Sequence, residues 1–292
     1  MPLMIKLPEP VDQVVVNLLR LANTKIPEDI GWAMESAAMW ESNKVALTQI
    51  GAIQDNLKKA EHMGKPMCQD TGIPVFYVRG SFTSDIADDI ARGVERATRE
   101  IPLRPNSVDP LTRANGGDNL GPGMPIIHYI PQKGDFTEIT VLVKGAGSEN
   151  MTRLAMLNPS DGLKGVEDFA VEAVLEAGGR PCPPVVLGVG IGGMSDTCAE
   201  MAKEALAAPL DAENPDPALR ELEERIFVRL NKSGLGPMGL GGMTTCLGVR
   251  AKKANCHTAS LPVCVNIGCW ATRRASARMT ENGVDYAQGA VL

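Results

Sequence analysis

The chain has 292 residues, of which 44% are hydrophobic and 22% charged, and this ordinary composition excludes a disordered or collagen-like protein. Its net charge of −6, with no basic block, argues against non-specific binding to nucleic acid. No apolar run approaches the ~20 residues of a membrane span, and the first residues do not read as a secretory signal. We therefore expect a cytoplasmic protein, in which seven cysteines favour metal ligation or catalysis over disulfides.

Helical and strand patterns alternate along the chain, which favours an α/β fold. The spacing predicts helices over 11–63, with Gly31 and Gly51 as candidate breaks, and nothing regular after Arg274. Ser84 is the candidate N-cap of a later helix. The remaining predicted helices are 84–100, 166–177, 195–207 and 217–231, and the predicted strands are 73–78, 126–130, 138–144, 185–189, 243–250 and 260–267.

Two segments between these elements are irregular. Residues 101–123 are dense in Pro, Gly, Asn and Asp, and a loop of that length in a compact domain is usually functional. Residues 209–219 are a polar, Pro-rich connection. We expect a single domain over 1–292, with a candidate subdomain boundary near 209–219.

The Gly-rich loops do not indicate a nucleotide site. Gly188–Gly193 fits the dinucleotide pattern G-x-G-x-x-G after a predicted strand, but Gly234–Gly239 fits it equally after a helix. The acidic strand end expected about 20 residues further on is missing, because residues 209–217 are loop. A dinucleotide-binding function is therefore disfavoured, and no ATPase-type phosphate loop is present.

The cysteines fall into different sequence contexts. Cys198, Cys246 and Cys264 lie in helix and strand patterns typical of a core, and Cys256 beside His257 is ambiguous. The other three lie in turns: Cys68 in 66–72, Cys182 in the Pro-flanked segment 180–184, and Cys269 in 267–270. Three turn-based thiolates fit zinc or an iron–sulfur cluster with one open position, although residue type alone still favours inert packing for each cysteine.

A structural zinc site finds less support. No close C-x₂-C pair exists, and the local set Cys256, His257, Cys264 and Cys269 has no standard zinc spacing.

Polar residues near the cysteine turns favour a site that binds a carboxylate instead. Gln69 and Asp70 follow Cys68, and Arg104 would act as a fork-shaped donor to a carboxylate.

Several motifs together resemble those of the class I fumarases and L(+)-tartrate dehydratases, which are iron–sulfur hydro-lyases. Residues 65–72, KPMCQDTG, resemble that family's C-Q-D-T-G motif, and 144–150, KGAGSEN, its K-G-[GA]-G-S loop. Cys182-Pro183-Pro184 and Gly268-Cys269-Trp270 match its other cysteine sites. The likeness extends from about residue 60 to 275, and the length resembles that of a separate α subunit.

The resemblance implies a fold of mixed sheets flanked by helices, of the iron–sulfur hydro-lyase α-subunit type. It also implies a [4Fe–4S] cluster held by Cys68, Cys182 and Cys269, whose open iron acts as a Lewis acid. A C4 dicarboxylate would then contact the residues that match the family's substrate site. The resemblance gives Asp70 and His257 catalytic roles. His257 is a candidate to reach the site from a neighbouring subunit. Those substrate residues are Gln69, Asp70, Arg104, Gly147 and His257.

This chain ends at Leu292 without the second domain that single-chain members carry, which leads us to expect a separate β subunit, an α₂β₂ assembly and a catalytic base on the β subunit. The loop 145–151 resembles the fumarase form, which favours hydration of fumarate to L-malate. Dehydration of L(+)-tartrate to oxaloacetate is the second candidate, and a non-catalytic zinc-binding subunit is the contrasting one.

Overall fold

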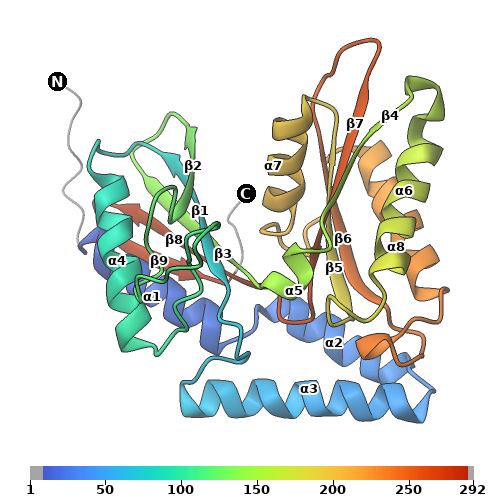
Figure 1. The fold of residues 1–292 in the computed structure, drawn as a ribbon, viewed down its shortest axis with the longest axis horizontal. Helices are drawn as coiled ribbons and strands as arrows, with labels where there is room; N and C mark the ends of the chain where they lie inside the picture. The colour runs from blue at the N-terminus through green and yellow to red at the C-terminus, as the bar shows by residue number, and fades with distance from the viewer. Residues whose placement is uncertain (1–8, 289–292) are drawn as a thin grey trace. The chain divides into compact units, whose positions relative to one another are not determined.

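The computed structural model describes residues 9–288, which form two compact units. Unit 1 comprises the chain up to Pro27, Leu57–Gly145 and the chain from Arg273 onward; unit 2 comprises Glu28–Asn56 and Ala146–Thr272. Each unit contains one mixed sheet with helices packed against it (Figure 1). The expected α/β class with mixed sheets flanked by helices is therefore confirmed.

Unit 1 is built on a five-stranded sheet in the order β2-β1-β3-β8-β9, in which only β1 and β2 are parallel. The alternating apolar residues of β3 and β8 turn one face of the sheet toward the core. The strands are β1 (Ile73–Gly80), β2 (Ile126–Pro131), β3 (Thr137–Lys144), β8 (Arg273–Thr280) and β9 (Gly283–Ala287).

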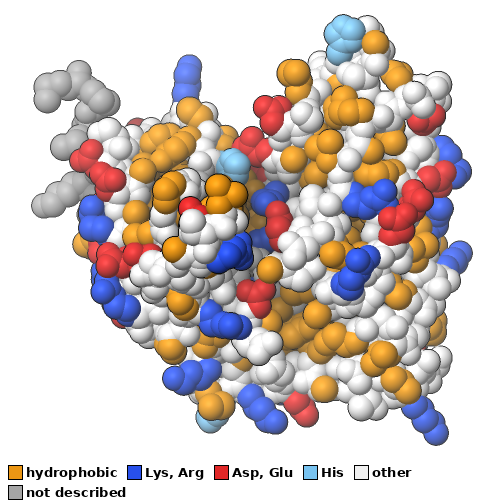
Figure 2. Space-filling model, viewed as in Figure 1, with side chains coloured by type: hydrophobic (Ala, Val, Ile, Leu, Met, Phe, Trp, Pro, Cys, Tyr) orange, Lys and Arg blue, Asp and Glu red, His pale blue; other side chains and the backbone are white. Residues whose placement is uncertain are grey.

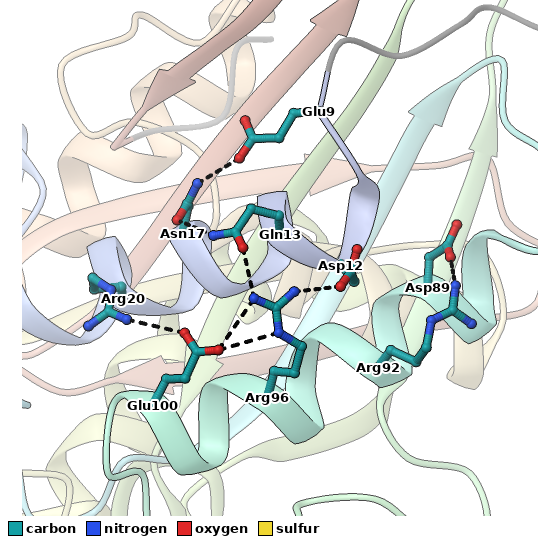
Figure 3. A network of polar contacts seen from close by, with 9 residues as sticks. All are labelled: Glu9, Asp12, Gln13, Asn17, Arg20, Asp89, Arg92, Arg96 and Glu100. Carbon is teal, nitrogen blue, oxygen red and sulfur yellow. Dashed lines mark hydrogen bonds and ion pairs between the residues drawn. The ribbon is translucent and has the colours of Figure 1, made fainter.

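Two helices, α1 (Val11–Thr24) and α4 (Ile86–Glu100), cover that core face. They pack closely because α4 has a glycine at the crossing, where a Cβ on Gly93 would lie 2.5 Å from Cβ of Val15. Arg96 also ties α4 to α1, by donating to Asp12 at 2.5 Å and to Gln13 at 2.8 Å (Figure 3).

Unit 2 contains a four-stranded sheet in the order β4-β7-β5-β6, in which only β5 and β6 are parallel. Helix α7 covers one face, and α6 and α8 cover the other (Figure 1). The strands are β4 (Arg153–Leu157), β5 (Val185–Ile191), β6 (Cys246–Lys253) and β7 (Leu261–Gly268). The helices are α2 (Glu28–Trp40), α5 (Ala146–Glu149), α6 (Gly162–Ala177), α7 (Ser195–Ala205) and α8 (Pro217–Asn231). Short 3₁₀ turns lie at Pro159–Asp161 and Pro237–Gly239.

The predicted helical stretch over 30–63 breaks at 41–43, and Gly31 and Gly51 both lie inside helices. Helix α3 (Lys44–Met63), which begins in unit 2 and ends in unit 1, starts there because the side chain of Asn43 accepts N–H bonds from Val45 and Ala46. Asn43 thus caps the start of α3.

Two further expectations need correction. Residues after Arg274 form β8 and β9, where no regular structure was expected. Helix α4 begins at Ile86, and Ser84 donates to Asp85 without capping it. The segment 209–219 lies inside unit 2, fastened by Leu210 N–H to Asp29 and by Asn214 to Glu223. No helix among residues 9–288 is long and apolar enough to cross a membrane.

Candidate functional site

The turn that precedes β1 in unit 1 carries Cys68, Gln69 and Asp70. Its backbone is anchored from α1, because the carbonyl of Asn23 accepts the N–H of Met67 at 2.9 Å, and Met67 is buried. Cys68 and Asp70 are half-buried, and Gln69 is exposed. Burying the residue before Cys68 therefore holds the thiol and the two polar side chains near the surface.

Asp70 is the most firmly held residue of this turn. Its Oδ1 accepts the N–H of Gly72 at 2.9 Å and the amide of Asn106 at 3.3 Å. Its carbonyl accepts a 2.8 Å bond from the guanidinium of Arg273, which is 1% exposed and also donates to Asn23. Charge-assisted bonds of this kind fix the turn relative to α1 and β8.

Arg104 comes from the irregular segment 101–123 and lies beside the same turn. Its N–H donates to Oγ1 of Thr71 at 2.9 Å, and its carbonyl accepts from Asn119 at 3.0 Å. The side chain is exposed, and within residues 9–288 no partner of its guanidinium is found. The backbone is thus fixed while the fork-shaped cation remains free for an anion.

In unit 2, the turns that carry Cys182 and Cys269 adjoin. The N–H of Trp270 donates to the carbonyl of Cys182 at 3.2 Å. The turns start β5 and end β7, and these strands are antiparallel with Val186 opposite Gly268, so both cysteines lie at the same end of the sheet. Cys182 is exposed, with φ of 55°, and Cys269 is half-buried.

Gly147 lies beside this pair of turns. It belongs to the short helix α5, and a Cβ at this position would lie 3.4 Å from the carbonyl of Arg180. Gly147 is exposed, so a ligand can approach its backbone closely. The two sets of matched residues are therefore Cys68, Gln69, Asp70 and Arg104 in unit 1, and Gly147, Cys182 and Cys269 in unit 2.

Burial separates the cysteines as their sequence contexts suggested. Cys198, Cys246 and Cys264 are fully enclosed, and burial raises the pKa of these thiols to about 12, about 12 and about 11. A thiol with such a pKa is a poor metal ligand at neutral pH, because the thiolate is the binding form. Cys68, Cys182, Cys256 and Cys269 are partly or fully exposed.

His257 is not brought to the cysteine turns of its own chain. It lies in the connection between β6 and β7, whereas Cys269 follows the other end of β7. Strand β7 has eight residues and therefore spans about 26 Å at the usual rise of a strand. His257 and Cys256 instead border a cavity of about 350 Å³ with almost wholly apolar walls, including Leu163, Leu222 and Leu261, which do not suit a dicarboxylate.

The same strand separates the members of the zinc set considered from the sequence. Cys264 is buried in the middle of β7, between His257 at one end and Cys269 at the other. Across the described part of the chain, no three His, Cys, Asp or Glu side chains form a group suited to a metal ion.

Three residues of this region were missed from the sequence. Arg273, Asn106 and Asn119 hold the Asp70 turn and the Arg104 segment in place. Asn119 adopts φ of 62° and accepts the N–H groups of Asn106 and Ser107, although its sequence context of Gly and Asp suggested only a loop. The sequence held no signal for Arg273, because adjacent arginines are typical of an exposed segment and only the fold buries them.

Comparison with known proteins places these residues in a family. A model described as fumarate hydratase (Fumerase) matches residues 12–278. The chain is 43% identical to a putative L(+)-tartrate dehydratase subunit alpha of Methanocaldococcus jannaschii, over 92% of this chain and 97% of the relative. It is 33% identical to L(+)-tartrate dehydratase subunit alpha of Escherichia coli K12, over 90% and 89%. Against a putative class I fumarate hydratase of Geobacillus stearothermophilus it is 35% identical over 95% of this chain, but spans only 55% of that longer relative. The chain therefore belongs to the fumarate hydratase (Fumerase) family.

Proposed function

We propose that this chain is the α subunit of a two-subunit iron–sulfur hydro-lyase that reversibly hydrates fumarate to L-malate. The observation that carries the proposal is the junction of the Cys182 and Cys269 turns beside Gly147, in a chain of this family. Both thiols reach the surface at one end of the sheet, where a ligand can approach them.

The thiol chemistry of the chain fits a [4Fe–4S] cluster held by Cys68, Cys182 and Cys269. These three are accessible and lie on turns whose backbones are hydrogen-bonded to neighbouring elements, whereas the core cysteines are held in the thiol form. When bound, such a cluster supplies a Lewis acid for the substrate's hydroxyl and carboxylate, because three thiolates leave one iron open.

Recognition of the dicarboxylate is assigned to Arg104, Gln69, Asp70 and Gly147. Because the chain carries a net charge of −6, long-range attraction does not favour a dianion, and short-range pairing must supply the affinity. The free guanidinium of Arg104 pairs with one carboxylate in a bidentate fork. The exposed backbone at Gly147 offers a close N–H contact to another carboxylate oxygen.

His257 acts in the site of a second copy of the chain, where it donates a hydrogen bond or a positive charge to the substrate. Its position at the far end of β7 from Cys269 supports this assignment over one within the same chain. Asp70, held through Oδ1 and its carbonyl, orients the substrate. The base that removes the carbon-bound proton is assigned to the β subunit.

The names and lengths of the relatives support a partner chain. The Geobacillus stearothermophilus relative carries in one chain a segment that this chain does not match, and the Escherichia coli and Methanocaldococcus jannaschii relatives are named as alpha subunits. Our proposal is that a separate β subunit supplies that segment and that the two chains assemble as α₂β₂.

Tartrate is the second candidate substrate. The loop 145–151 resembles the fumarase form and favours fumarate, whereas the names of the two alpha-subunit relatives favour L(+)-tartrate. Both are C4 dicarboxylates, so the proposed Arg104 contact serves either one.

The decisive experiment is co-expression of the chain with its β subunit, anaerobic purification, and assay on fumarate, L-malate and L(+)-tartrate. We expect a brown complex that interconverts fumarate and malate, and an Arg104→Lys complex with kcat/KM lower by on the order of 10²-fold, because one or two charge-assisted bonds are lost. Arg113→Lys, an exposed arginine in the same segment, is the matched control and should stay within about twofold.

Turnover of tartrate alone would transfer the proposal to the second candidate. A colourless complex that binds zinc, with no turnover of any of the three acids, would refute it.

A further inference from the structure

Helix α2 of unit 2 carries large apolar side chains on its exposed face as well as on its buried face. Ile30, Met34 and Ala37 share one face and are buried. On the opposite face, Trp32 is 57% exposed and Met39 is 81% exposed. An amphipathic surface helix normally shows polar residues on its outer face, so this second apolar face is suited to a partner.

The exposed apolar surface continues beyond the end of the helix. Trp40, in the last turn of α2, is 76% exposed. The segment 236–243 lies against the turn that follows α2, where the hydroxyl of Ser42 contacts Sδ of Met243 at 3.8 Å. Figure 2 shows hydrophobic side chains at the surface in the region of α2. We define the docking face as Trp32, Met39, Trp40, Leu240 and Met243, all large and exposed.

A single buried carboxylate makes this surface rigid. Glu41, 7% exposed, accepts the N–H groups of Ser42 and Asn43 on Oε1 and those of Met243 and Thr244 on Oε2. These bonds join the end of α2 to the segment that carries Met243. A surface held in one conformation loses less entropy when it binds, which is the property of a binding face.

The docking face is continuous with one of the matched cysteine turns. The N–H of Met238, in the same segment as Leu240 and Met243, donates to the carbonyl of Pro183 at 2.8 Å. Pro183 follows Cys182 directly. A chain seated on the docking face therefore lies next to a residue proposed to hold the cluster.

Charge distinguishes between two candidate occupants of the docking face, a second copy of this chain and a different polypeptide. Exposed Glu28 and Glu35 flank Trp32 on the outer face of α2, and the helix contains no Lys or Arg. In a two-fold dimer of this chain, the face would meet itself and these like charges would be brought together. A different polypeptide with an apolar centre and a rim of Lys or Arg is complementary to it.

We propose that the docking face binds the β subunit. The matching surface of the β subunit would be an apolar patch with Lys or Arg residues around its edge. This inference rests on the proposed function and goes beyond it, because it assigns the surface of α2 and the segment 236–243 to the α–β contact. Tryptophan and methionine are enriched at the energetic centres of interfaces, and here two of the chain's three tryptophans are exposed on one helix.

The test is co-expression of the full chain with a tagged β subunit, followed by affinity capture and size-exclusion chromatography with light scattering. Trp32→Glu and Trp40→Glu each place a charge in the contact and should lower the captured chain at least 10-fold. Leu175→Glu, on an exposed position of α6, is the matched control and should be captured like the wild type. Circular dichroism and iron content verify that each variant is folded and loaded.

Capture of both tryptophan variants at the wild-type level, or failure of the wild type to bind the β subunit, would overturn the proposal. If the chain alone dimerises and Trp40→Glu makes it monomeric, a second copy is the occupant and the proposal is also overturned. The outcome is separable from that of the proposed function, because a wild-type complex that assembles but turns over none of the three acids refutes only the activity.

Discussion

At the scale of single residues, the accessible cysteines are expected to react differently from the buried ones. In the folded, iron-free protein at pH 8, iodoacetamide should modify the four accessible cysteines and spare the three whose pKa burial raises to about 11 or 12. Reconstitution with iron and sulfide should then protect Cys68, Cys182 and Cys269, and peptide mass spectrometry reads out each site.

Cys256 is the internal control for this labelling, because it is exposed but lies in the β6–β7 connection with no proposed ligand role. It should remain reactive after reconstitution. Protection of Cys256 together with continued labelling of Cys68 would remove Cys68 from the ligand set.

Arg273 is expected to act as a positioning residue for the Asp70 turn. A single nitrogen of Arg273, Nη1, donates both to the carbonyl of Asp70 and to Oδ1 of Asn23. Arg273→Lys keeps the charge, but the ammonium of the shorter lysine side chain does not reach the position that Nη1 occupies between these two acceptors. We expect KM for malate to rise about 10-fold, the cost of roughly one lost bond to a charged group. The spectrum of the reconstituted cluster should shift as well, because Cys68 belongs to the same turn.

Arg278→Lys, in the same strand β8, is the control for this change. If Arg273→Lys lowers only the midpoint of thermal unfolding and leaves both KM and the spectrum at wild-type values, its role is structural alone.

At the scale of elements, local signals predicted most helices and strands, and the bounds predicted for α8, 217–231, match the structure to the residue. Failures came where tertiary contacts decide the outcome. The break after α2 depends on Glu41 binding N–H groups of a segment some 200 residues away, and such a contact leaves no local sequence signal. Strand β8 begins with two buried arginines, which do not resemble a strand core.

Glu41 provides a pH-dependent test of that break. Burial raises the pKa of Glu41, but four backbone N–H bonds outweigh it, so that the net pKa lies below the ordinary value of 4.5. A carboxyl whose pKa is lower in the folded state stabilises the fold above its unfolded pKa, and loses that contribution as pH falls through the folded pKa. Glu41→Gln should therefore lower the free energy of unfolding at pH 7 by about 1–3 kcal/mol.

The measurement is urea unfolding of the wild type and the variant at pH 7 and at the lowest pH where both remain folded. The difference between them should shrink at the lower pH. Glu35→Gln, on the exposed face of the same helix, is the control and should show almost no difference. A gap of equal size at both pH values would mean that the charge of Glu41 is not what stabilises the turn.

At the scale of the whole molecule, the α/β class followed from the alternation of patterns, but the division into two units did not. The chain passes between the units four times, and none of these crossings carries the Pro-rich signal that drew attention to 209–219. The residues that match the family's motifs are likewise divided between the two units. Their assignment to one site therefore came from the resemblance of the motifs and not from their spacing in the sequence. His257 shows the limit of that approach, because β7 separates it from Cys269 in its own chain.

This separation leads to a prediction about the assembly. If His257 acts in the site of a second copy, mixing two inactive variants should restore activity. In a mixed dimer of Cys182→Ser and His257→Asn chains, one site combines both substitutions, and the other combines the wild-type cysteine with the wild-type histidine. With random pairing, half of the dimers are mixed and each has one intact site, so turnover should reach about a quarter of the wild-type value.

The measurement is malate dehydration by co-expressed variants carrying different tags, purified in the presence of the β subunit. Mixing Cys182→Ser with Cys269→Ser is the control and should restore nothing, because both cysteines adjoin within one chain and neither combination yields an intact site. If the first mixture is as inactive as the second, His257 serves its own chain or no site at all, and its assignment to a neighbouring copy fails.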